Sequence, residues 1–129
     1  MINLGLLIIR LVVGLTFMGH GVQKLFGWFG GHGLKGTAGW MESIGLRPGW
    51  WMALLAGLSE LIGGALFAAG VGTALGAALI VLTMLVAIFK VHGKNGYWIT
   101  DGGIEYNVVL IAVAIGVALI GPGSYVLIG

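Results

Sequence analysis

Residues 3–26, NLGLLIIRLVVGLTFMGHGVQKLF, decide the fold, because they form an apolar run that is long enough to cross a bilayer. A transmembrane helix needs about 20 consecutive, mainly apolar residues. No basic segment precedes the run, so we expect a retained helix rather than a cleaved signal peptide. The polar side chains of the run gather towards its end, where glycines also accumulate.

The composition of the whole chain places it in a membrane. Of its 129 residues 59% are hydrophobic and 8% are charged, and the mean hydropathy is +1.10. A soluble domain has about one quarter charged residues. The length allows four crossings with short connections, so we expect one domain over residues 1–129. A net charge of +2 is too small to indicate nucleic-acid binding, and the absence of cysteine excludes disulfides and thiolate metal sites.

Clusters of glycine and aromatic residues divide the chain into four apolar spans, expected at about 3–26, 48–70, 73–92 and 103–120. Pro48 fits the first turn of the second span, where its missing N–H costs nothing. Thr73 is a candidate N-cap for the third span, and Thr100 or Asp101 for the fourth. The predicted fold is therefore an all-α integral membrane four-helix bundle.

The connection between the first two spans, residues 34–47, is too long and too patterned for a plain turn. Trp40, Met41 and Ile44 fall on one side if this segment is helical. Two interpretations fit equally well: a short helix lying in the membrane interface, or an irregular loop with aromatic anchors.

The basic residues predict the orientation of the chain in the membrane. Five of the six lysines and arginines flank the first and third connections: Lys24, Lys35, Arg47, Lys90 and Lys94. By the positive-inside rule these connections are cytoplasmic and both termini are outside. We expect the protein in the cell membrane of a bacterium or archaeon.

Polar residues of the first span share one half of its helical wheel: Asn3, Arg10, Thr16, His20, Gln23 and Lys24. Arg10 lies deep in the span, where an unpaired charge costs about 2.5 to 3.5 kcal/mol. Glu60, near the middle of the second span, is the carboxylate at comparable depth. The sequence therefore predicts a buried Arg10–Glu60 ion pair, which either only fixes helix packing or has a functional role.

A second polar group is expected where the spans end on the cytoplasmic side. His20, Gln23 and Lys24 share a helical face there. The ends of the later spans add candidate ligand-binding and wall residues: His92, Trp98, Glu105, Tyr106 and Asn107. We predict one pocket at this edge. The alternative is that the basic side chains snorkel to the membrane surface and that the carboxylate of Glu105 only interacts with the dipole of the helix that it begins.

Several other chemistries lack a sequence basis. The three histidines have no helical His-x-x-x-His or Glu-x-x-His spacing, so we expect neither a metal nor a haem site. No phosphate-binding loop, nucleophile elbow or catalytic triad spacing is recognisable, and no flavin or iron–sulfur motif is present. A redox role would therefore require a diffusible carrier, and quinone is the cofactor that we expect.

Four segments carry a resemblance to a known family: HGVQKLFG at 20–27, the preceding Arg10, ELIGG at 60–64 and GGIEYN at 102–107. Together they resemble the DoxX family of small membrane proteins, over nearly the whole chain. The resemblance implies a compact four-helix membrane bundle. Some members are linked to thiosulfate oxidation with a quinone acceptor, and others to membrane oxidoreductase complexes that handle oxidative or thiol stress. Membership fixes architecture better than function.

Two functions from different classes stay open at this point. In the first, the protein is a quinone-interacting component of a membrane oxidoreductase: His20 and Lys24 bind a head-group carbonyl, and Glu105 accepts or relays a proton. In the second, it is a non-catalytic scaffold or assembly factor. A small-solute carrier is a third, weaker interpretation. The expected partners are membrane lipids, a lipophilic molecule such as quinone, and either a redox subunit or further copies of the chain.

Overall fold

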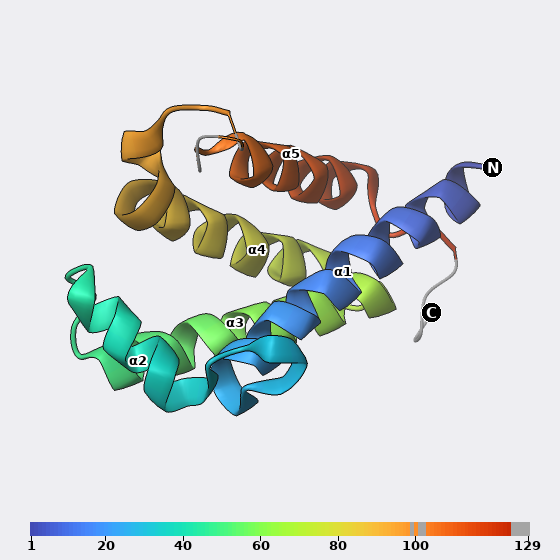
Figure 1. Cartoon of the computed structure of the whole chain (residues 1–129). Helices are drawn as coiled ribbons and strands as arrows, with labels where there is room; N and C mark the ends of the chain where they lie inside the picture. Colours follow the sequence, from blue (N-terminus) through green and yellow to red (C-terminus); the bar gives the residue numbers. More distant parts are fainter. Residues whose placement is uncertain (99, 101–102, 125–129) are drawn as a thin grey trace.

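The computed structural model describes residues 1–98, 100 and 103–124, and these residues form helices and connections with no strand. The α-helices are α1 (Ile2–Phe26), α2 (Gly33–Ser43), α3 (Gly49–Ala69), α4 (Thr73–Ala87) and α5 (Glu105–Ile120) (Figure 1). A 3-10 turn (Trp28–Gly30) follows α1, while a π-helical turn (Ile88–His92) and a 3-10 turn (Gly93–Asn95) extend α4. The all-α prediction is confirmed.

The four long helices lie where the sequence predicts spans, with bounds that agree within two residues when the π-helical turn is included. Among the described residues, three helices are long and apolar enough to cross a membrane: Ile2–Phe26, Gly49–Ala69 and Thr73–Lys90. The apolar helix α5 is shorter, with 16 residues.

The predicted helix caps differ from the observed ones. Thr73 is the first residue of α4 rather than its cap, because the left-handed Gly72 precedes it and makes the turn. The buried Thr73 hydroxyl makes no cap bond. Pro48 is itself the cap of α3. Ile104 caps α5 in place of Thr100, and Asp101 lies outside the described residues.

The segment between the first two spans is a helix, which decides between the two interpretations of its sequence. Its side chains Thr37, Ala38 and Met41 are buried, and Ala38 and Met41 pack against Ala53 of α3. Trp40 is 46% exposed, so it does not share a face with Met41 as the pattern suggested. A position in the membrane interface stays a prediction.

Helix α1 crosses α3 closely because glycines face each other at two levels (Figure 1). A Cβ on Gly14 would lie 2.6 Å from the Gly64 carbonyl oxygen, and one on Gly21 would lie 2.6 Å from the Gly57 carbonyl oxygen. The two glycines on each helix are seven residues apart and pair in opposite order, so the helices run antiparallel. Small residues at such a crossing let backbones approach in lipid.

One apolar core joins the four long helices. It takes Leu6 and Phe17 from α1 and Phe67 from α3, and its remaining buried members come from α4 and α5: Ala77, Ile80, Met84, Leu110, Ala114 and Val117. Helix α3 packs on α1, α4 on α3, and α5 on α4. As a result, the end of α1, all of α2 and the end of α4 lie at one end of the molecule (Figure 1).

Candidate functional site

A partly buried ion pair between Lys24 and Glu60 joins α1 to α3. Glu60 is 2% exposed, whereas the Lys24 side chain is 26% exposed. The Lys24 ammonium donates to Oε1 of Glu60. The prediction that Glu60 pairs with Arg10 is therefore wrong. Arg10 and Glu60 are nevertheless both buried, as their depth in the spans indicated.

Arg10 binds backbone carbonyls instead of a carboxylate. Its Nε donates to the Phe67 carbonyl oxygen at 3.3 Å, and Nη2 donates to that of Ala68 at 3.0 Å. Its Nη1 donates to the Pro122 carbonyl oxygen at 2.8 Å. The last carbonyls of a helix lack intrahelical partners and carry the negative end of its dipole. Arg10 thus stabilises the C-terminal end of α3 and ties the segment after α5 to α1.

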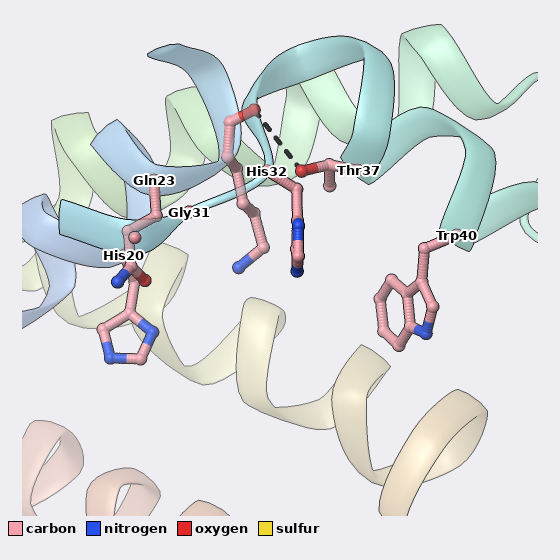
Figure 2. A pocket seen from close by; sticks show the side chains of 8 residues that line it. His20, Gln23, Gly31, His32, Thr37 and Trp40 are labelled. Atoms are coloured by element: carbon pink, nitrogen blue, oxygen red, sulfur yellow. Dashed lines mark hydrogen bonds between the residues drawn. The ribbon is translucent and has the colours of Figure 1, made fainter. Parts of the chain in front are cut away.

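A pocket of about 270 Å³ lies beside the ion pair at the end of α1. Three sides are formed by consecutive parts of the chain: α1, the connection that follows it, and α2 (Figure 2). The lining residues are His20, Gln23, Lys24, Gly30, Gly31, His32, Thr37 and Trp40. Three of these, His20, Gln23 and Lys24, were predicted to line one pocket.

Hydrogen bonds hold the walls of this pocket together. The Gln23 amide nitrogen donates to the Phe29 carbonyl oxygen at 3.1 Å, and the Thr37 hydroxyl donates to the Lys24 carbonyl oxygen at 3.4 Å (Figure 2). A Cβ on Gly31 would collide with the backbone of Gln23, so the connection lies directly on α1. The connection therefore forms a wall of the pocket that is held against the end of α1.

The side chains of the pocket offer hydrogen-bond donors beside an aromatic surface. Figure 2 shows the rings of His20, His32 and Trp40 projecting to the same side. The Lys24 ammonium has three donors, of which Glu60 takes one. The arrangement suits a flat ligand that carries oxygen acceptors.

The residues that line this pocket do not include four of the other predicted site residues: Trp98, Glu105, Tyr106 and Asn107. The buried Asn107 donates from Nδ2 to Met84 Sδ at 3.4 Å. Glu105 begins α5, and Trp98 and Tyr106 are exposed by 63% and 39%. The side chain of His92 lies outside the described part of the structure.

The pocket contains three polar or aromatic residues that the sequence did not indicate as site residues: His32, Thr37 and Trp40. Their position depends on α2 folding back over α1 after a short connection rich in glycine. The glycines around His32 were a usable signal, since they permit the left-handed backbone found at Gly30 and Gly33.

Comparisons with known proteins agree with this architecture. The model of the DoxX family matches residues 5–93, a range that contains the whole pocket and Glu60. A protein of Bacillus subtilis (strain 168) named "Putative oxidoreductase CatD" is 33% identical over 119 residues, which cover 92% of this chain and 81% of that protein. No solved structure gives a significant match.

Proposed function

The chain belongs to the DoxX family, and from this premise we propose that it is a quinone-binding component of a membrane oxidoreductase system. Its apolar helices make it an integral membrane protein. The name of the Bacillus subtilis relative supports a role among oxidoreductases. The observation that carries the proposal is the pocket at the end of α1, where His20 and Lys24 stand side by side next to a buried carboxylate.

The donors of the pocket match the oxygens of a quinone head group. His20 and Lys24 donate hydrogen bonds to one carbonyl oxygen, and Trp40 provides a flat surface for the ring. The amide nitrogen of Gln23 is used by Phe29, which leaves its oxygen to accept from a hydroxyl of the reduced ligand. The apolar tail needs only the bilayer, which adjoins the exposed faces of the helices.

A quinone supplies a two-electron, two-proton acceptor, and the chain would contribute binding and proton transfer. The electrons come from a reduced redox subunit that associates in the membrane. Lys24 stabilises negative charge that develops on the ligand oxygen, because its side chain lines the pocket and carries a positive charge. Histidine is a common general acid or base, and His20 lines the pocket where it can act as one.

Binding of a short-tailed benzoquinone to the detergent-solubilised protein tests the proposal by isothermal titration calorimetry. We expect His20→Ala to weaken binding about tenfold, which corresponds to about 1.4 kcal/mol and to one lost hydrogen bond. Leu11→Ala, on the exposed apolar face of α1, is the matched control and should bind as the parent does. Circular dichroism verifies that both variants are folded.

Lys24 requires a different variant, because Lys24→Met alone leaves the buried Glu60 without its partner. The double substitution Lys24→Met with Glu60→Gln removes both charges and should also weaken binding. A parent protein that binds no benzoquinone, or a His20→Ala variant that binds as tightly as Leu11→Ala, would contradict the proposal and favour the scaffold function.

A further inference from the structure

We propose that ligand binding in the pocket is coupled to proton uptake by Glu60, and that Lys24 links the two events. This inference rests on the proposed function and identifies where the site takes up one of its protons. The sequence assigned proton transfer to Glu105, which does not line the pocket. Glu60 was assigned only to an ion pair with Arg10, which it does not form.

Lys24 connects the pocket to the carboxylate, because it lines the pocket and is bonded to Glu60. Lys24 lines the pocket and is partly exposed, whereas Glu60 is 2% exposed and lies behind it. Without a ligand the ammonium is paired with the carboxylate, and a ligand in the pocket offers it a second acceptor. Any ligand oxygen that binds Lys24 competes with Glu60 for the same positive charge.

The other helices give Glu60 no substitute cation within the described ranges. Helix α4 has no ionisable side chain between Thr73 and Ala87. Helix α5 has no lysine, arginine or histidine between Glu105 and Ile120. Helix α2 contributes Glu42, which packs at Gly49, eleven residues or about 16 Å along α3. Lys35 of α2 and Lys90 of the π-helical turn after α4 are cations, but their side chains are exposed. On α1, Arg10 is engaged with carbonyls at the far end of α3, and His20 faces the pocket.

A buried carboxylate that loses its counter-charge becomes neutral rather than remaining ionised. The ionised form is strongly disfavoured in a low dielectric, so protonation is the less costly outcome. When Lys24 turns to the ligand oxygen, Glu60 therefore takes one proton from water that enters through the pocket. Binding and proton uptake then occur together.

The same proton serves the reduction step. Two electrons arrive from the reduced redox subunit, and the two ligand oxygens require two protons. Lys24 gives one proton to the oxygen that it binds and regains one from Glu60, so the ammonium and carboxylate form again and pair. The other ligand oxygen takes the second proton from water, because His20 and Lys24 both bind the first oxygen. The site thus returns to its starting charge when the reduced ligand leaves.

Calorimetry of benzoquinone binding in two buffers of different ionisation enthalpy measures the net number of protons exchanged. We expect the parent protein to take up about one proton for each ligand bound near neutral pH. Glu60→Gln should bind the ligand with no uptake, because the glutamine cannot be protonated. Glu42→Gln, an acidic residue of α2 outside the pocket, is the matched control and should keep the uptake of the parent.

Infrared difference spectroscopy of the parent gives a second measurement that needs no variant. The carbonyl stretch of a protonated carboxylic acid should appear on binding and shift in deuterated water. Binding without proton uptake, or equal uptake by Glu60→Gln and the parent, overturns this inference and leaves the proposed function intact. A parent protein that binds no benzoquinone overturns both.

Discussion

The two buried charges of the α1–α3 contact, Arg10 and Glu60, have partners of different kinds. Glu60 is paired with Lys24, and Arg10 donates to three carbonyl oxygens. The helical wheel predicted the burial of both residues, because it gives the face of a helix. It could not give the partner, because the partner depends on how far α1 is shifted along α3, and the crossing of Gly14 over Gly64 sets that shift.

Double-mutant cycles should distinguish a Lys24–Glu60 pair from an Arg10–Glu60 pair. Glu60→Gln and Lys24→Met should show a coupling energy of about 1 to 3 kcal/mol, because the side chains are in direct contact. Glu60→Gln and Arg10→Gln should be additive, since the carbonyls that bind Arg10 lie about 10 Å along α3 from Glu60. Unfolding of the solubilised protein by sodium dodecyl sulfate measures both cycles. A coupling between Arg10 and Glu60 as large as that of the Lys24 cycle would contradict the Lys24–Glu60 pairing.

At the scale of helices, the sequence predicted well which segments are helical and where each helix begins and ends. It predicted less well how the helices are arranged in space. A long apolar run that ends at a glycine leaves little freedom in where its helix can end. The left-handed caps Gly27 and Gly70 end α1 and α3 close to the predicted residues. The candidate site was predicted only on its α1 side. The opposite wall comes from α2, whose return over α1 depends on tertiary contacts such as Ala38 and Met41 against Ala53, and no periodicity within one helix encodes such contacts.

Replacing a glycine of the α1–α3 crossing by alanine, the smallest possible enlargement, should destabilise the protein. In an ordinary helix, replacing glycine by alanine stabilises by about 0.5 to 1 kcal/mol. At Gly14 and Gly21 the added methyl group would meet backbone atoms of α3 at 2.6 Å, so we expect a loss of about 1 to 3 kcal/mol from overpacking.

Gly19 lies on the same helix and provides the matched control, because a Cβ there meets nothing within 4 Å. Gly19→Ala should leave stability unchanged or raise it, again measured by unfolding in sodium dodecyl sulfate. Equal responses at Gly14, Gly19 and Gly21 would mean that the two helices do not pack through these glycines.

At the scale of the whole molecule, the fold separates basic residues from the termini. The end of α1, α2, the start of α3 and the end of α4 lie together, and the N-terminus, the turn after α3 and the end of α5 lie at the opposite end (Figure 1). Five of the six lysines and arginines belong to the first group. The pocket lies at this basic end as well, so the orientation of the chain decides which compartment supplies its protons.

The charge distribution predicts that the basic end is cytoplasmic, and single cysteines can test it because the natural chain has none. The buried Thr73 is unsuitable as a reporter of the opposite end, whereas Ser124 is exposed there, and Lys35 and Lys94 are exposed at the basic end. An impermeant maleimide added to intact cells should label Ser124→Cys and leave Lys35→Cys and Lys94→Cys unlabelled until the membrane is permeabilised. Labelling in the reverse pattern would place the pocket and the Lys24–Glu60 pair on the outer side. Glu60 would then draw its proton from the exterior, and proton uptake on binding would follow the external pH instead of the cytoplasmic pH.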